Sequence, residues 1–207
     1  MNSLEKSPLV AQTVSTANAD CRLEVTITYP TATALHIRYR VHNASQLPLY
    51  LFNQLYKRLY RRPETNTLVY DIDSNLVNVH LSAERVTVGK AVVDVPDWIL
   101  VEALQTPCLS RVLPGESIEE VMELSLPLMP YTVYDYSPSQ GPLVARTLFI
   151  ELGYILASPY TESFITPVTT NSTVETAYHI GALPADEQSL ITAGPFEGFV
   201  SVVSSLS

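Results

Sequence analysis

The sequence predicts an all-β protein built as an antiparallel β-sandwich, on three observations. Apolar and polar residues alternate with a period of two in several segments, which is typical of strands with one buried face. Proline is common (15 residues) and glycine is scarce (7), a balance that suits strands separated by stiff turns. With 207 residues, 46% of them hydrophobic, the chain is long enough for one domain with a sizeable core.

The first 20 residues are polar and aperiodic, so we expect a flexible arm at 1–20 and a single sandwich domain at 21–207. Alternation begins at LEVTITY (23–29), where the leucine, valine, isoleucine and tyrosine share one face. The segment LHIRYRVH (35–42) divides as cleanly, with histidines and arginines on the opposite face. Both are predicted to be half-buried strands, and the turn-forming NASQLP (43–48) follows them.

Strand-like segments continue to the C-terminus at the spacing expected of a sandwich. They are TLVYDI (67–72), NLVNVHLS (75–82), RVTVGKAVVDV (85–95), SIEEVMELSLPL (117–128), RTLFIELGYIL (146–156), TAYHIGAL (176–183) and GFVSVVSSL (198–206). The third is predicted to be a hairpin around Gly89–Lys90, and Glu119–Glu120 fall out of step in the fourth, which indicates a bulge. About eight or nine antiparallel strands with few helix signals favour an immunoglobulin-like sandwich.

One short helix is predicted after the third strand, in LFNQLYKRLYRRP (51–63). Leu51, Leu55 and Leu59 are spaced by four, and polar residues fill the opposite arc, as in an amphipathic helix that Pro63 ends. About ten residues are marginal as a free helix, so its leucine and tyrosine face must pack on the sandwich. The basic residues of the helix are then expected to project outward.

Charge is distributed unevenly along the chain, whose net charge is −9. No acidic residue lies between Glu24 and Glu64. That window holds half of the twelve basic residues, namely Arg38, Arg40, Lys57, Arg58, Arg61 and Arg62. We therefore expect a protein with a basic side and an acidic side, provided that the fold keeps these segments together.

Two segments are candidates for partner binding. The first is the basic cluster Lys57, Arg58, Arg61 and Arg62. The second is the loop PYTVYDYSPSQGP (130–142), whose tyrosines, serines and glycine match the composition of binding loops. Its candidate residues are Tyr131, Tyr134 and Tyr136, and we expect the two sets to be neighbours at one end of the sandwich. A solvated helix face and an ordered crossover loop that covers the core remain the alternatives.

These features predict a non-catalytic protein-interaction module. It would dock an acidic or aromatic-rich protein partner, or a second copy of the chain, through the basic helix and the tyrosine-rich loop. Nucleic acid is disfavoured because phosphates repel a chain of net charge −9. A membrane surface is disfavoured because the apolar arc of the helix is needed for the core. We expect a cytoplasmic protein, since the N-terminus has no signal-type apolar run and no segment reaches the roughly 18 apolar residues of a membrane span.

No catalytic site and no cofactor are predicted. Three of the four histidines fall at strand positions, where a structural role is usual. Cys108 has no neighbouring histidine to form a thiolate pair, and the scattered glycines form no phosphate or dinucleotide motif. Cys21 and Cys108 are interpreted as two buried thiols, with a single disulfide between them left open.

No metal site is predicted either. Asp71–Asn75 begins like a calcium loop, but Leu76 and Ser82 stand where glycine and a bidentate glutamate are required. A hairpin turn is the simpler interpretation. An enzyme with an unfamiliar site around Asp71, Asp73 and His80 is kept as an alternative function.

Three turn motifs give the chain a resemblance to a known family. A strand ends in Asn43-Ala44-Ser45, Pro48-Leu49-Tyr50-Leu51-Phe52 follows, and Leu113-Pro114-Gly115-Glu116 precedes a later strand. This arrangement resembles the immunoglobulin-like domains of the bacterial intracellular proteinase inhibitor type, over about half of the chain. The resemblance implies an immunoglobulin-like fold. It also implies an alternative function, a proteinase inhibitor that presents an exposed loop, for which 130–142 is the candidate segment.

Overall fold

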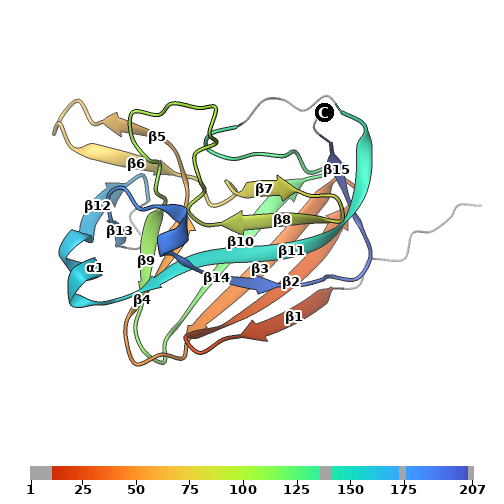
Figure 1. The fold of residues 1–207 in the computed structure, drawn as a ribbon, viewed down its shortest axis with the longest axis horizontal. Helices are drawn as coiled ribbons and strands as arrows, with labels where there is room; N and C mark the ends of the chain where they lie inside the picture. The colour runs from red at the N-terminus through yellow and green to blue at the C-terminus, as the bar shows by residue number, and fades with distance from the viewer. Residues whose placement is uncertain (1–10, 136–140, 173–175, 205–207) are drawn as a thin grey trace, which may run out of the picture.

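The computed structural model describes residues 11–135, 141–172 and 176–204. The chain is all-β, as predicted, with fifteen strands, one α-helix and one 3-10 helix across these residues. The strands form two layers, an antiparallel four-stranded sheet and a larger, curled sheet of mixed direction (Figure 1). None of the helices in the described residues is long and apolar enough to cross a bilayer.

The four-stranded sheet has the order β1-β2-β3-β10. Its strands are β1 Gln12–Ala17, β2 Cys21–Thr31, β3 Ala34–Asn43 and β10 Ser117–Ser125. The prediction of a flexible arm is wrong over 12–17, because these residues pair with β2 along their whole length. Their only sizeable apolar side chain is Val14, which packs on the core, so the sequence carries little alternation there.

The mixed sheet has the order β5-β6-β12-β13-β9-β4-β11-β8-β7, and β14 and β15 also pair with β11. Its strands are β4 Leu49–Gln54, β5 Tyr56–Arg61, β6 Leu68–Ile72, β7 Asn78–Leu81, β8 Arg85–Lys90, β9 Cys108–Val112, β11 Leu143–Leu156, β12 Thr166–Thr170, β13 Ala177–His179, β14 Ser189–Ala193 and β15 Val200–Val203. Two pairings are parallel, β8 with β11 and β6 with β12. The prediction of purely antiparallel sheets is therefore wrong for this layer, and the strands outnumber the eight or nine expected.

The helix predicted after the third strand is also wrong, because residues 51–61 form the end of β4 and all of β5. β4 lies between β9 and β11 and is buried on both faces, so it shows no period of two. A bulge between Tyr56 and Leu59 of β5 then produces the spacing that imitates a helix. The α-helix found in the described residues is α1 Pro159–Phe164, which the Ser158 capping box begins; the 3-10 helix η1 spans Ala185–Glu187.

Two local predictions fail for a related reason. Gly89–Lys90 do not form a turn; they are the last residues of β8, and Lys90 is buried in step with Val86 and Val88. β10 has no bulge, because its pairing with β3 is regular and Glu120 lies on its inward side. In both strands a charged residue occupies a core-facing position.

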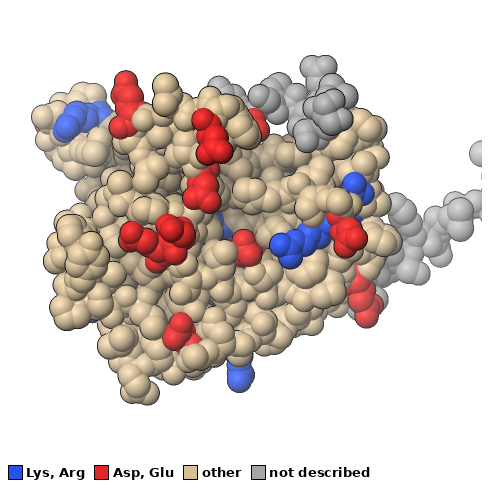
Figure 2. Space-filling view, viewed as in Figure 1, with Lys and Arg blue, Asp and Glu red and all other residues tan. Residues whose placement is uncertain are grey.

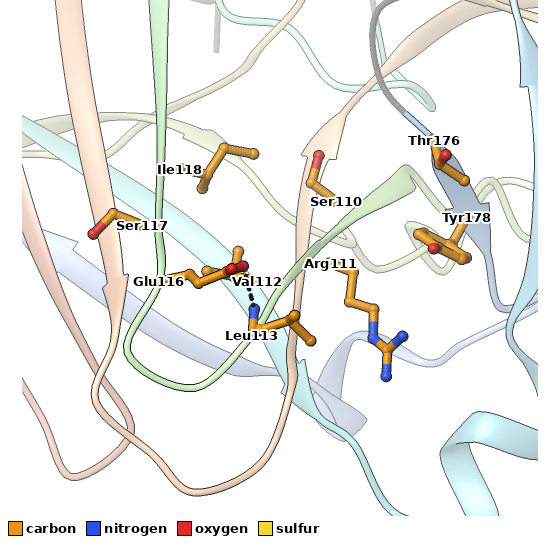
Figure 3. A pocket seen from close by; sticks show the side chains of 9 residues that line it. All are labelled: Ser110, Arg111, Val112, Leu113, Glu116, Ser117, Ile118, Thr176 and Tyr178. Atoms are coloured by element: carbon orange, nitrogen blue, oxygen red, sulfur yellow. Dashed lines mark hydrogen bonds between the residues drawn. The ribbon is translucent and has the colours of Figure 1, made fainter.

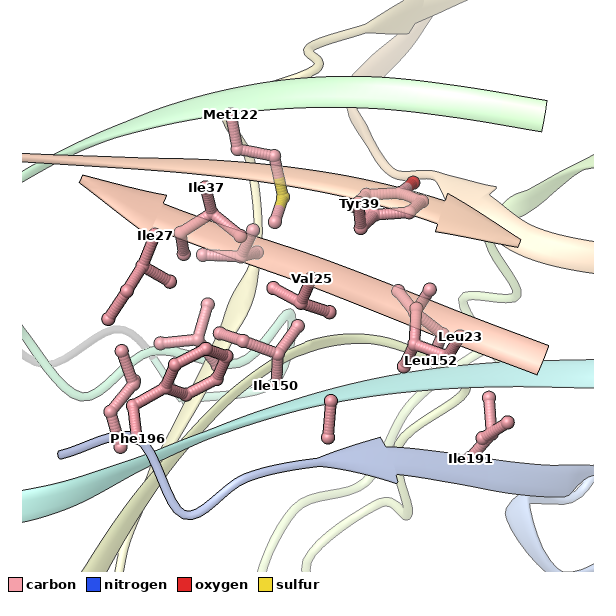
Figure 4. Packing of buried hydrophobic residues seen from close by; sticks show 14 of the residues in the cluster. Leu23, Val25, Ile27, Ile37, Tyr39, Met122, Ile150, Leu152, Ile191 and Phe196 are labelled. Atoms are coloured by element: carbon pink, nitrogen blue, oxygen red, sulfur yellow. The ribbon is translucent and has the colours of Figure 1, made fainter. Parts of the chain in front are cut away.

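The main core fills the space between the two layers (Figure 4). Leu23, Val25 and Ile27 of β2 meet Ile150 and Leu152 of β11 there, all with no exposed surface. A smaller cluster around Tyr50 and Phe52 covers the other side of β4. The layers are thus joined by one continuous apolar interface, as alternating strands predict.

The two cysteines are free, which resolves the possibility of a disulfide. Cys21 belongs to the main core and Cys108 to a separate cluster with Tyr70. Burial raises the pKa of Cys21 to about 11 and that of Cys108 to about 12, so both thiols stay protonated at neutral pH.

Candidate functional site

The predicted basic residues lie on or beside β5, at the edge of the mixed sheet. Within the described residues β5 pairs only with β6, and the two strands form a hairpin that projects from the body (Figure 1). Lys57, Arg58 and Arg61 are exposed on β5, and Arg62 follows it directly. The bases therefore project from a strand hairpin and not from a helix.

Two of these bases are paired within the hairpin. Lys57 Nζ lies 2.6 Å from an Asp73 carboxylate oxygen, and Arg58 Nε donates to Asp71 at 3.0 Å. Burial raises the pKa of Asp73, yet hydrogen bonds from Lys57 and from the Asn75 N–H outweigh it and hold that pKa below its usual range. The pair with Asp73 in turn raises the pKa of Lys57. Much of the positive charge at this end of β5 is therefore neutralised locally.

The other two bases are differently placed. Arg61 Nη1 donates to the Asn66 carbonyl oxygen at 2.9 Å, across the turn that closes the hairpin. In the described part of the chain, no carboxylate forms an ion pair with Arg61 or Arg62. These two guanidinium groups are available to an external anion.

The tyrosine-rich segment begins beside β7. Tyr131 forms a backbone bridge with Val79, and the Tyr134 hydroxyl accepts a hydrogen bond from the Gln105 N–H at 2.7 Å. Tyr136 lies outside the described residues.

Tyr134 and the hairpin line one groove of about 570 Å³. Lys57 and Arg58 line it from the hairpin, and the segment 99–105 supplies a second part of the lining, which includes one carboxylate, Glu102. Leu59 and Val101, which are 45% and 37% exposed, add apolar surface. The structure thus brings Lys57, Arg58 and Tyr134 together. The described residues that line the groove do not include Tyr131, Arg61 or Arg62.

A buried ion pair lies between the two sheets, and sequence reasoning missed it. Lys90 Nζ, on a side chain that is 1% exposed, donates to Glu120 Oε2 at 3.0 Å. Glu120 also accepts hydrogen bonds from the Tyr39 hydroxyl and from Asn53 Nδ2. The carboxylate is thus held by donors from three strands, and Asn53 is fixed in turn because its Oδ1 accepts from the Ser110 N–H of a fourth.

The ion pair forms part of the wall of a cavity of about 340 Å³. Burial and the Glu120 carboxylate raise the pKa of Tyr39, which therefore remains a hydrogen-bond donor. Three donors satisfy Glu120, as a charge withdrawn from water requires. Lys90, Glu120, Tyr39 and Asn53 therefore form a fixed polar network. The sequence could have predicted the ion pair, because the period of two places Lys90 and Glu120 on the inward faces of their strands.

Residues of the resemblance motifs meet at one end of the molecule. Asn43 is fully buried, and its Nδ2 donates to the carbonyl oxygens of Leu47 and Val112. Its backbone exchanges hydrogen bonds with Gly115 and Glu116. Gly115 has a φ of +78°, which a glycine adopts without strain. The asparagine therefore joins the two turns, a structural task.

A cavity of about 420 Å³ lies beside these turns, between β9, β10 and β13 (Figure 3). Its charged lining residues are Arg111 and Glu116. Arg111 is directed to Glu162 at 3.5 Å and lies over the Tyr50 ring, while Glu116 accepts from the Leu113 N–H. These charges are engaged within the protein.

The alternative site around Asp71, Asp73 and His80 is not assembled at one cavity. The two aspartates pair with Arg58 and Lys57, whereas His80 lines a cavity whose described lining includes neither aspartate. Across the described ranges, no three His, Cys, Asp or Glu side chains are grouped as a metal ion would require.

Comparison with known proteins finds no matching family model, no similar curated protein and no similar solved structure.

Proposed function

We propose that this chain is a non-catalytic protein-interaction module. The observation that carries the proposal is the groove between the β5–β6 hairpin and the segment 99–105, which Lys57 and Arg58 line together with residues far along the chain and to which Tyr134 contributes an aromatic ring. A groove that combines apolar and aromatic groups with two bases and one carboxylate, Glu102, has the composition of a protein-binding surface.

An acidic, aromatic-containing segment of a partner protein is the occupant that best matches these groups. Leu59 and Val101 offer exposed apolar contacts. Arg61 and Arg62, just beyond the groove, have no ion-pair partner in the described residues and would attract acidic side chains. Lys57 and Arg58 already pair with aspartates of this chain, so new ion pairs with partner carboxylates would add little binding free energy.

Docking through side chains is favoured over addition of a partner strand to β5. A bulge interrupts β5 between Tyr56 and Leu59, and the charged Lys57 and Arg58 lie within it. Bulges and charged side chains are the usual devices that stop edge strands from pairing with other chains. The partner is therefore expected to contact the groove walls, while the edge of β5 stays unpaired.

The proposal includes the fold class, namely that the two packed sheets form an immunoglobulin-like sandwich. Face-to-face packing of two sheets through alternating apolar residues supports it. The parallel pairings of β8 with β11 and of β6 with β12 are additions to such a sandwich.

The test is selection of random displayed peptides on the immobilised protein, followed by affinity measurement of the enriched peptides. We expect acidic sequences that contain aromatic residues. Arg61→Glu should weaken their binding by about tenfold, because an attraction becomes a repulsion. The matched control is Arg22→Glu, the same charge change at an exposed site on β2 outside the groove, which should leave affinity within about twofold.

Two results would count against the proposal. One is the absence of any enriched sequence class. The other is equal weakening by Arg61→Glu and Arg22→Glu, which would mean that only overall charge matters. Tyr134→Ala serves as a second variant and should also weaken binding, since it removes an aromatic contact and the hydrogen bond from Gln105.

A further inference from the structure

A second cavity, of about 480 Å³, opens on the outward face of the mixed sheet and has a different lining. Its floor is formed by β7, β8 and β11, and it is lined there by small residues, Thr87 and Gly89 of β8 and Ala91 just after the strand. The loop 92–98 and the segment 185–188 form its walls. The surface is hollow here because the floor carries small side chains and the two neighbouring segments rise above it.

Gln188 braces these walls. Its Oε1 accepts from the Val92 N–H at 2.9 Å, and its Nε2 donates to the Val92 carbonyl at 2.7 Å and to the Ala185 carbonyl at 3.1 Å. One side chain thus ties the loop to the segment before β14. A cavity held in this way is organised before any ligand arrives.

The cavity is strongly acidic. Asp94, Glu151 and Asp186 line it together with Asp135, and no Lys or Arg is among the described lining residues. In the part of the chain that the structure describes, the first three carboxylates form no ion pair, although Glu151 accepts from the Thr192 hydroxyl at 2.8 Å. Figure 2 shows acidic side chains gathered on this face of the molecule.

His80 does not offset this charge. Partial desolvation at the rim of the cavity lowers the pKa of His80, and the Glu151 carboxylate only partly opposes that effect. The imidazole is therefore neutral at neutral pH, and the cavity keeps its negative charge.

A second observation points to a ligand that donates hydrogen bonds. Asn78 lines the cavity and is 2% exposed. Its Nδ2 donates to the Ala91 carbonyl at 3.1 Å, but within the described residues its Oδ1 has no hydrogen-bond partner. A buried acceptor left without a donor lowers stability, so it is a natural place for a donor supplied by a ligand.

A third observation is Trp98, the chain's one tryptophan, which lines the cavity and is 80% exposed. A large aromatic ring so exposed next to carboxylates is suited to a cation, because the face of the indole ring attracts positive charge. The ring would also cover the hydrocarbon stem of a long basic side chain.

We propose that this cavity binds a cationic side chain, arginine or lysine, of a basic peptide segment. Guanidinium and ammonium groups donate hydrogen bonds and accept none, which matches a lining of carboxylates and an unpartnered amide oxygen. A metal ion matches this cavity less well, because the described residues contain no group of three suitable ligands. The site is independent of the proposed groove and selects the opposite charge.

The test uses tri-arginine amide as the probe and the fluorescence of Trp98 as the readout, which is local because no other tryptophan is present. In buffer of about 0.15 M salt, where long-range attraction is screened, we expect a saturable change of emission. Tri-citrulline amide, of nearly the same shape but without the three guanidinium charges, should give a much weaker change. Asp94→Asn with Asp186→Asn should weaken binding by about tenfold.

The matched control is Glu64→Gln with Glu84→Gln, which changes net charge equally at two exposed sites outside the cavity. It should leave affinity within about twofold. Equal weakening by both pairs, or a signal that does not saturate, would mean general attraction to an acidic protein and would overturn the proposal. Trp98→Leu, measured by calorimetry, should weaken binding several-fold; unchanged affinity would remove the aromatic part of the proposal.

Discussion

At the scale of single residues, Lys90 and Glu120 are the most informative feature of the core. Each occupies an inward position that its neighbours fill with apolar side chains. A charge is tolerated in such a position only when another charge and further hydrogen bonds compensate for the lost water. The two residues are 30 positions apart in the chain and on different sheets, so each explains the presence of the other.

We therefore expect strong coupling between them. Lys90→Met leaves the Glu120 carboxylate without its cation and should cost about 3–5 kcal/mol of unfolding free energy. Glu120→Gln leaves Lys90 buried and unpaired, with a similar penalty. The double variant should lose at least about 1 kcal/mol less than the sum of the single losses, because it leaves no unpaired charge. Urea unfolding of the three variants measures this, and additive losses would show that the pair is not coupled.

At the scale of elements, the period of two predicted strands well where one face is buried and the other meets solvent. β2, β3 and the inward side of β10 are of this kind. The same reasoning failed for β4, where every residue from Leu49 to Asn53 is buried, and for β5, where a bulge shifts the register. Periodicity reports one-sided burial, so an interior strand or a bulged one gives no such signal.

The parallel pairing of β8 with β11 depends on close contact at Gly89. A Cβ added there would lie 2.6 Å from the Glu151 backbone carbonyl oxygen. Gly89→Ala should therefore cost about 1–3 kcal/mol, because the two backbones must separate. Hydrogen exchange should increase in β8 and β11 and stay unchanged in β2 and β3.

A gain in the stability of the Gly89→Ala variant would contradict this prediction. In an open site, glycine-to-alanine substitution stabilises a protein by about 0.4–1 kcal/mol through the unfolded state. Stabilisation of the Gly89→Ala variant would therefore show that β8 and β11 do not approach as closely as the structure indicates.

At the scale of the whole molecule, the fold mixes charges that the sequence keeps apart. The basic β3 pairs with the acidic β10, where Arg38 lies 2.6 Å from Glu119. Lys57 and Arg58 likewise find Asp73 and Asp71. Three of the six bases on the predicted basic side are therefore paired within the protein, and three carboxylates that form no ion pair among the described residues gather around the cavity of Trp98. Which distant segments become neighbours depends on strand order, which the local pattern does not contain.

The candidate site shows the same limit. The sequence suggested Lys57, Arg58 and Tyr134 as candidates, and these three line one groove in the fold. It could not identify the acidic cavity, because Asp94, Glu151 and Asp186 come from three separate segments and none belongs to a motif. The outward residues of β7, β8 and β11 line a cavity because the loop 92–98 and the segment 185–188 lie beside them. A local sequence pattern does not show where those two segments lie.

One core shared by both layers predicts one cooperative unfolding transition. Residues of β2, β3 and β10 belong to the same buried cluster as residues of β8, β11, β14 and β15, so neither sheet keeps its apolar face covered without the other. Ile150→Ala, at the centre of this cluster, should cost about 2–5 kcal/mol. Leu190→Ala, on the half-exposed side of β14, is the control and should cost much less. Urea unfolding followed by far-ultraviolet and by near-ultraviolet circular dichroism should give coincident curves for the parent, and Ile150→Ala should shift both curves together. Two separate transitions, or a shift in one curve alone, would mean that the sheets fold as independent units.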